Sequence, residues 1–324
     1  MNINRLLQQR EIAIALSIAV VCIVASIAWP SVFPTFGNLS QLFLNISIET
    51  IVACGMMILL ISGAFDLSVG SVVALSGGIA AYLLYNHGMY PLPAILAGVG
   101  AAALIGLING YLVAYVGINP MIQTLAMMGI VRGVAMMISG SGIQNLHADF
   151  TVLGQSRFLG FQSPVWIMMA VVLVLHVLMS KHVLFRQYYY IGSNEQAAIL
   201  SGIRVKRLKM HSFVLISLLA GIAGVLLAAR MGAALGTSGR GMELRVITAA
   251  ILGGASLLGG TGKVFGALLG TIFMGLVSNV LIIARVSGYW QDIVLGIILI
   301  VAVWLDLALK KQSVKSLKKV VGKR

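Results

Sequence analysis

Residues 191–209, IGSNEQAAILSGIRVKRLK, form a long polar insert between apolar blocks of membrane length. It carries four Lys and Arg residues, and positive charge between spans marks the cytoplasmic side of a membrane protein. An organised polar element on that face indicates a docking site for a partner. The apolar sequence on both sides of the insert indicates a bilayer.

The insert contains the start and stop signals of a short helix over residues 194–201. Ser193 and Gln196 match a capping box, and Glu195 suits the positive end of the helix dipole. Gly202 stands where a left-handed stop is expected. The helix would expose the small residues Ala197 and Ala198. Such a helix could simply order a loop, but we favour a knob that enters a partner's cleft, since exposed alanines stabilise nothing internally.

Composition places the rest of the chain in a membrane. Hydrophobic residues make up 60% of the sequence, charged residues 9%, and the mean hydropathy is +1.03. A hydrocarbon core of about 30 Å needs about 20 apolar residues per helix. We therefore expect an all-α, polytopic integral membrane protein of about ten transmembrane helices. The expected spans are 12–29, 43–62, 69–86, 92–116, 120–140, 164–180, 210–230, 245–259, 262–283 and 289–307.

The net charge of +14 is concentrated at the edges of the apolar runs. Arg5 and Arg10 precede the first run, six Lys and Arg fall within 181–209, and seven fall within the basic tail 310–324. Ten spans put all three regions on one side, so both termini are expected in the cytoplasm of a bacterial inner membrane. The tail is expected to meet anionic lipid headgroups or solvent, and no nucleic acid. The outer segments would be 30–42, 141–163 and 231–244.

No pattern in the sequence indicates an enzyme, a cofactor or a metal site. The apolar run 12–29 is long for a secretory signal and is expected to remain as the first helix. Cys22 and Cys54 lie in apolar runs without metal or redox spacing. GGTGK, residues 259–263, resembles a phosphate loop, but Leu257 and Val264 replace the Gly and Ser/Thr that a Walker A motif needs.

The chain is expected to form a single transmembrane domain over 1–324, in two halves of five spans, 1–163 and 164–309. The second half contains the cytoplasmic loop 181–209. A weak repeat links IVACGMMILLISGAFDLSVG (51–70) with ITAAILGGASLLGGTGKVFG (247–266). Halves of five spans have opposite orientations, as in inverted-repeat transporters. The alternative is that any two Gly-rich membrane hairpins look alike.

Charged residues within the spans are few. Asp66 is interpreted as a cap on the helix that begins at Leu67 or Ser68; the alternative is a substrate or ion ligand. An ion-coupled carrier would bury carboxylates near the middle of the membrane. We expect none there, with Glu49 in the outer half of a span. Energy for transport would then come from a docked partner.

Four segments together resemble the permease subunits of bacterial ABC importers of the ribose, galactose and xylose class, relatives of the branched-chain amino-acid permeases. They are SGAFDLSVGS (62–71), NPMIQTLAMMGIVRG (119–133), IGSNEQAAILSGIRVKRLK (191–209) and MELRVITAAILGGASLLGGTGKVFGALLG (242–270). The resemblance covers residues 12–308. This chain departs from the family at Ala64 and Phe65, where Gly-Ile is usual, and at Ser193, where a second Gly is usual.

The resemblance implies a second permease copy or a paralogue, two ATP-binding cassette subunits, a periplasmic binding protein and a sugar or related small polar substrate. The implied coupling residues are Ser193, Asn194, Glu195, Ala197, Ala198, Ser201 and Gly202, and the implied family motif includes Asp66, Gly70, Gly262 and Gly266. Candidates for contact with the binding protein are Asp149, Arg157, Arg240 and Glu243.

A neutral sugar needs polar partners for its hydroxyls and no strong counter-charge. Candidates for such a pathway are Asn45, Ser47, Asn109, Gln123 and Thr124, each of which could instead be a polar residue of helix packing. Two other function classes fit the spans: a stand-alone ion-coupled secondary transporter, and a membrane anchor or assembly factor. Neither explains the capped cytoplasmic helix.

Overall fold

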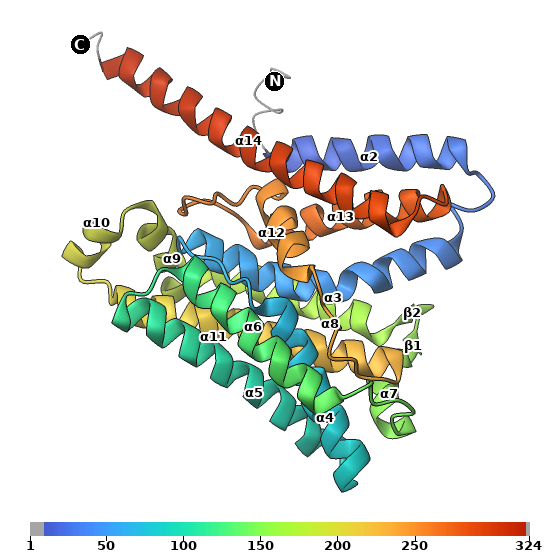
Figure 1. The fold of residues 1–324 in the computed structure, drawn as a ribbon. Coiled ribbons are helices and arrows are strands. Elements are labelled where there is room, and N and C mark those ends of the chain that lie inside the picture. Colours follow the sequence, from blue (N-terminus) through green and yellow to red (C-terminus); the bar gives the residue numbers. More distant parts are fainter. Residues whose placement is uncertain (1–9, 322–324) are drawn as a thin grey trace.

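The computed structural model describes the backbone of residues 10–321 and the side chains of 11–304 and 306. The helices are α2 (Arg10–Ala28), α3 (Phe36–Ile61), α4 (Val69–His87), α5 (Pro91–Tyr111), the π-helix η1 (Leu112–Val116), α6 (Pro120–Ser139), α7 (Ala148–Gln155), α8 (Ser163–Lys181), α9 (Val183–Ser193), α10 (Glu195–Leu200), α11 (Val205–Met231), α12 (Met242–Leu252), α13 (Val264–Ile283) and α14 (Gly288–Val321). The strands β1 (Arg157–Phe158) and β2 (Phe161–Gln162) form an antiparallel hairpin. Figure 1 shows the fold.

Eight of the described helices are long and apolar enough to cross a membrane: α2, α3, α4, α5 with η1, α6, α8, α11 and α13. The apolar first part of α14, Gly288–Trp304, corresponds to the tenth expected span. The chain is therefore a polytopic helical membrane protein, as its composition predicts.

The expected helix over 245–259 is wrong in length. The helix found there, α12, has 11 residues and a length of about 16 Å, about half of the hydrocarbon core. Glycines at 253, 254, 259, 260 and 262 end the helix, and four of these five have positive φ. The chain continues from α12 as a non-helical segment, 253–263, until α13 begins.

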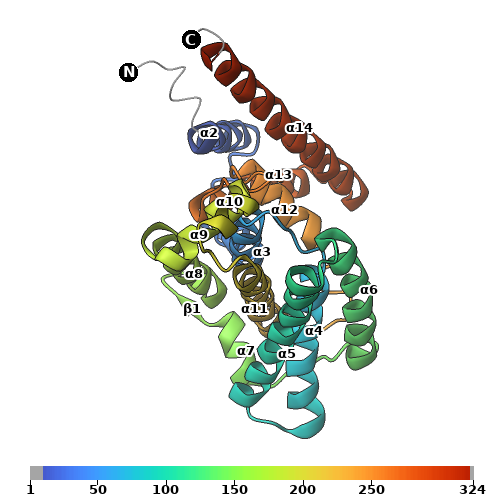
Figure 2. The same ribbon diagram turned by 90° about the vertical axis from the view of Figure 1, so that its left-hand side faces the viewer.

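α3 and α11 form the centre of the bundle, and the other helices surround them (Figure 2). α3 packs against α11, α12 and α13, whereas α11 packs against α3, α4 and α5. Each central helix thus packs mainly against helices from the other half of the chain. Packing of this kind is expected when two halves with similar helix arrangements interlock.

The two ends of the bundle differ. α9 and α10 lie at one end, and α7 and the β1–β2 hairpin lie at the opposite end (Figure 1). α14 continues as a helix into the basic tail, as far as Val321. The basic side chains of Arg5, Arg10 and 310–324, which supported the expected topology, lie outside the described side chains.

Candidate functional site

α10 is a six-residue helix at the end of the bundle that carries α9. Its N-cap is Asn194, whose side-chain oxygen accepts a hydrogen bond from the Ala197 N–H at 3.0 Å. The capping box predicted from Ser193 and Gln196 is therefore wrong, because Ser193 is the last residue of α9. One residue in the extended conformation, Asn194, separates the two helices and serves as a cap for both.

The rest of α10 follows the prediction, with one exception. Glu195 lies in the first turn and forms an ion pair with Lys209 of α11 at 2.7 Å. Gly202 has a φ of +79°, the left-handed conformation expected of a helix stop. Ala197 is exposed as predicted, but Ala198 is buried against the core. The large exposed side chains are instead Ile199 and Leu200, of which Leu200 is 89% exposed.

Three of the quoted sequence segments meet where α9 ends. The Gly260 N–H donates to the carbonyl of Ile61, the last residue of α3, at 2.9 Å. A Cβ at Gly192 would clash with that same carbonyl and with the Gly260 backbone. Tyr189 donates its hydroxyl to the Gly262 carbonyl at 2.9 Å, and burial raises the pKa of this phenol, which keeps it protonated. The end of α9, directly before α10, thus packs against the end of α3 and the segment 260–262.

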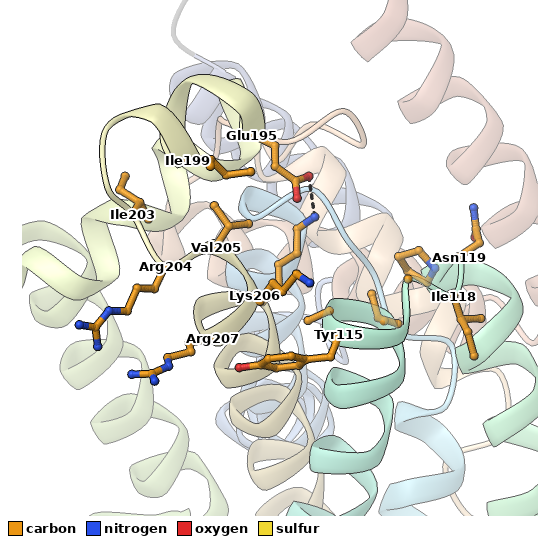
Figure 3. Close-up of a pocket in the computed structure, with 15 residues that line it drawn as sticks. Tyr115, Ile118, Asn119, Glu195, Ile199, Ile203, Arg204, Val205, Lys206 and Arg207 are labelled. Atoms are coloured by element: carbon orange, nitrogen blue, oxygen red, sulfur yellow. Dashed lines mark hydrogen bonds and ion pairs between the residues drawn. The ribbon is translucent and has the colours of Figure 1, made fainter.

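Two cavities flank α10. One, of about 320 Å³, lies between α9 and α10 and is lined by Tyr190, Ser193, Asn194, Ala197, Ala198, Ser201 and Ile203. The other, of about 740 Å³, lies between α10, η1 and the start of α11. Figure 3 shows Glu195 and Ile199 above this cavity, Tyr115 below it and the basic residues Arg204, Lys206 and Arg207 beside it. α10 therefore lies between two cavities, and its apolar residues Ile199 and Leu200 are exposed.

Asp66 is buried in the non-helical turn between α3 and α4. Its Oδ1 accepts hydrogen bonds from the Ser68 N–H at 2.7 Å and the Ser68 hydroxyl at 2.6 Å. The Asn109 amide donates to Ser68 at 3.1 Å and lies 3.4 Å from Asp66 Oδ2. Gln123 in turn donates to Asn109 at 3.2 Å. Asp66 thus binds a free N–H before α4, and it also links the turn to α5 and α6.

The candidates for the pathway separate into two groups. Asn109 and Gln123 belong to the Asp66 network. Ser47 and Thr124 are buried, and each donates its hydroxyl to a carbonyl of its own helix. Asn45 alone of the five lines a described cavity, and its Oδ1 accepts from Arg230 at 2.6 Å. All five residues therefore have hydrogen-bond partners within the protein, as the packing alternative that the sequence left open would require.

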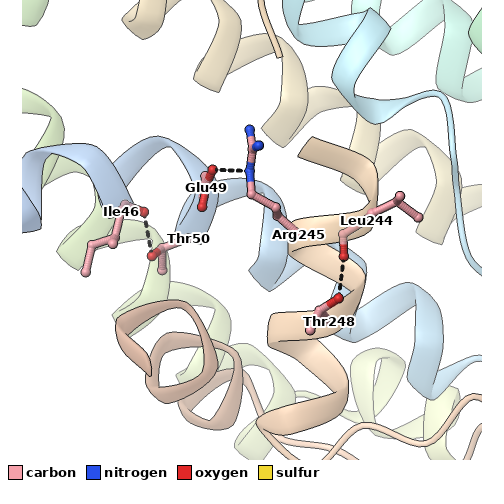
Figure 4. Close-up of polar contacts among 6 residues, drawn as sticks. All are labelled: Ile46, Glu49, Thr50, Leu244, Arg245 and Thr248. Carbon is pink, nitrogen blue, oxygen red and sulfur yellow. Dashed lines mark hydrogen bonds and ion pairs between the residues drawn. The ribbon is translucent and has the colours of Figure 1, made fainter. Parts of the chain in front are cut away.

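A charged pair lies at the middle of α3, and it includes Glu49, the carboxylate that the sequence placed within a span. Glu49 is near the midpoint of Phe36–Ile61, and its Oε1 accepts from Arg245 Nε of α12 at 2.7 Å (Figure 4). Figure 4 also shows the terminal nitrogens of Arg245 pointing away from Glu49. Because α12 begins at Met242, this pair lies at the N-terminus of a helix that starts within the bundle.

The candidates for contact with a binding protein lie in two places. Asp149 in α7 and Arg157 in β1 are exposed at the end opposite α10 (Figure 1). Arg240 is also exposed, in the segment that leads to α12. Glu243 differs: its Oε2 is buried, and a Cβ at Gly70 would meet it at 2.5 Å. This carboxylate faces the bundle and not the outer surface.

The sequence did not single out several residues that hold these parts together. Arg132 of α6 donates to the carbonyls of Gly236 and Ser238 at 2.8 and 2.7 Å, which fixes the segment before α12. Tyr189 holds the segment before α13. An arginine within the apolar run 120–139 was the available signal for Arg132, since such residues are paired inside membranes. Within the described residues no group of His, Cys, Asp and Glu could hold a metal ion.

The family of branched-chain amino acid transport system permease components matches residues 38–303. The chain is 40% identical over 289 residues to the L-arabinose transport system permease protein of Escherichia coli K12, which covers 89% of this chain and 88% of the relative. It is 37% identical to the ribose import permease protein of the same strain (93% and 94%) and 36% identical to its D-allose transport system permease protein (87% and 87%). No solved structure matches. The chain therefore belongs to the branched-chain amino acid transport system permease component family.

Proposed function

We propose that the chain is the membrane permease subunit of an ATP-binding cassette importer and forms the translocation path for a neutral monosaccharide. The sugar class is supported by the L-arabinose, ribose and D-allose permeases to which the chain is similar over most of its length. It is also supported by the polar, nearly charge-balanced surroundings of the Glu49–Arg245 pair. ATP hydrolysis would take place on a partner subunit.

The observation that carries this proposal is the attachment of α10. A surface helix that only ordered a loop would need no rigid link to the centre of the bundle. Here Asn194 caps the helix, Glu195 pairs with Lys209 of α11, and Gly192 at the end of α9 packs against Ile61 at the end of α3. Movement of α10 would therefore be transmitted to α11 and, through α9, to α3.

The surface of α10 fits a protein partner. Leu200 is 89% exposed and Ile199 is 56% exposed, at the end of the bundle that the positive charges assign to the cytoplasm. Exposed apolar residues beside concave surfaces are typical of interaction sites. We infer that Ser193, Asn194, Glu195, Ala197, Ser201 and Gly202 border the contact with the ATPase, with Ile199 and Leu200 at its centre. Ala198, which is buried, supports the helix.

The remaining subunits follow from the same proposal. A second permease, either a copy or a paralogue, would complete the path, and each permease would bind one ATPase subunit. Asp149, Arg157 and Arg240 are exposed and supply charges for a binding protein that delivers the sugar at the opposite end. Both termini would lie in the cytoplasm.

The alternative, an ion-coupled carrier, needs a carboxylate that exchanges its ion during transport. Glu49 is held by Arg245, whose Nε lies 2.7 Å from its Oε1. Asp66 accepts three hydrogen bonds, from Ser68 and Asn109, that fix its position. Both carboxylates thus have structural partners, which favours energy supplied through α10.

The proposal is tested by uptake of labelled L-arabinose, D-ribose and D-allose into cells that express the chain with its ATPase and binding protein. Uptake of at least one sugar should stop when ATP is depleted and should persist when ion gradients are collapsed by ionophores. Gly202→Pro should abolish it without loss of membrane insertion, because proline cannot adopt a φ of +79°. Uptake that follows the ion gradient, or normal uptake by Gly202→Pro, would contradict the proposal.

A further inference from the structure

The outer half of α3 carries a line of polar residues that ends at the middle of the helix. Asn38, Asn45 and Glu49 are spaced seven and four apart, which places them on one helical face. Asn38 pairs with Asn279 of α13, Asn45 with Arg230 of α11, and Glu49 with Arg245 of α12. Beyond Thr50, the residues from 51 to 61 are all apolar or glycine, and all are buried. The polar face therefore stops at a definite depth.

A cavity of about 180 Å³ lies along this polar face, between α3, α12, α13 and α14. At about 10–15 Å³ per water molecule it has room for on the order of a dozen waters, which is enough for a single pentose or hexose. Its polar lining consists of Asn45, Glu49, Arg245, Ser278, Asn279, Gln291 and Asp292. This lining suits a solute with many hydroxyls.

Part of this lining has unused hydrogen-bonding capacity. Arg245 uses only Nε toward Glu49, and its terminal nitrogens have no partner among the described residues (Figure 4). In the same part of the chain, Ser278 and Asp292 are without hydrogen-bond partners. Guanidinium groups donate to hydroxyl oxygens and carboxylates accept from hydroxyl hydrogens, so the free groups complement an alcohol in both of its roles.

The balance of charge selects a neutral ligand. Glu49, Asp292 and Arg245 all line the cavity, and Arg230 is bonded to Asn45 of the same lining. An anionic solute would meet the carboxylates and a cationic solute the two arginines. A neutral polyol avoids both conflicts and can bond to groups of either charge.

We propose that this cavity is a monosaccharide-binding subsite within the permease, in which Arg245, Ser278 and Asp292 bind the hydroxyl groups of the sugar. The inference rests on the proposed function for the class of ligand, and it adds the position along the transport path at which the sugar binds. The site lies along α3 beside the N-terminal turn of α12, a helix that starts inside the bundle.

The test is protection of a cysteine by sugar in the purified, detergent-solubilised chain. Cys22→Ala removes the partly exposed thiol, whereas Cys54 is buried and can stay. Ser278→Cys then reports on the cavity, and Asn119→Cys, which lines the separate cavity beside η1, is the matched control. A small neutral methanethiosulfonate labels each variant with and without L-arabinose, D-ribose, D-allose, D-xylose or D-galactose, with betaine at equal osmolarity as the blank.

We expect at least one sugar to slow the labelling of Ser278→Cys severalfold and to leave Asn119→Cys unchanged. The inference is overturned if no sugar protects Ser278→Cys, if both cysteines are protected equally, or if Ser278→Cys is not labelled at all. This assay needs no ATPase, so its outcome is separate from that of the ATP-depletion experiment. Lack of protection with intact ATP-driven uptake would remove the subsite and leave the proposed function standing.

A second variant tests the cavity during transport. Ser278→Leu fills it with an apolar side chain, and Ser17→Leu makes the same change on the exposed surface of α2. We expect Ser278→Leu to lower uptake at least tenfold while ATP hydrolysis stimulated by the binding protein persists. Uptake by Ser278→Leu equal to that of Ser17→Leu would contradict the subsite.

Discussion

Asn194 is a single residue on which the geometry of the cytoplasmic helices depends. It ends α9 in an extended conformation, and its side chain caps α10. A sequence pattern cannot easily choose between adjacent Ser and Asn as the cap, because both residue types are favoured there. Asn194 is the cap because Ser193 belongs to α9, an amphipathic helix that was not predicted from the sequence.

Replacement of the cap distinguishes these two assignments. Asn194→Ala should loosen α10 by about 0.5–2 kcal/mol, since it removes the bond to the Ala197 N–H. The expected readout is faster hydrogen exchange at the amides of α10, by roughly 2- to 30-fold, measured by mass spectrometry. Ser193→Ala is the matched control and should leave exchange in α10 unchanged. The reverse pattern would restore Ser193 as the cap.

Asp66 offers a second test at the same scale. Asp66→Leu would leave the N–H and the hydroxyl of Ser68 without their acceptor, and each unpaired buried group costs about 1–3 kcal/mol. The midpoint of thermal unfolding in detergent should therefore fall clearly. Asp66→Asn keeps one acceptor oxygen and should lose less stability. Equal losses in the two variants would show that the network does not depend on Asp66 as an acceptor.

At the scale of helices, the sequence predicts most of the fold but not the interruptions. Of the ten spans expected from long apolar runs, eight are found in the described residues as helices long enough to cross a membrane, because a membrane helix must satisfy its backbone internally and needs a fixed length. The span expected over 245–259 is not found, because α12 ends at Leu252. Residues 253–263 are mostly small or apolar, but contacts with Tyr189 and Ile61 hold them in a non-helical conformation. Contacts between segments about 70 and 200 residues apart have no signature in local sequence.

Small residues at intervals of four predict where helices approach closely, and α5 allows a matched test. A Cβ at Gly106 would lie 2.6 Å from the Phe213 carbonyl of α11, whereas a Cβ at Gly100 meets nothing within 4 Å. We expect Gly106→Val to destabilise the bundle by about 1–3 kcal/mol or to prevent its assembly. Gly100→Val should remain close to the parent in thermal unfolding. Equal stability of the two variants would mean that α5 and α11 are not in close contact.

For the whole molecule, the structure joins two regions that the sequence treats separately. The end of α9, directly before α10, packs against the end of α3, and the Glu49–Arg245 pair lies at the middle of the same α3 helix. The sequence predicted α10 from its cap residues and stop. It could not predict the charged centre, because Glu49 and Arg245 are 196 residues apart and each stands alone in an apolar context. One helix thus connects the proposed ATPase contact with the proposed sugar site.

The docking of an ATPase on α10 is tested most directly by mass spectrometry of the proteins that co-purify with the tagged chain after gentle detergent extraction from its native membrane. We predict a stoichiometric ATP-binding subunit that is lost in Leu200→Gln. The control is Leu159→Gln, at a residue that is 72% exposed in the hairpin at the opposite end, and this variant should retain the subunit. Recovery of the chain without any ATP-binding subunit, or equal recovery of that subunit with both variants, would contradict this docking.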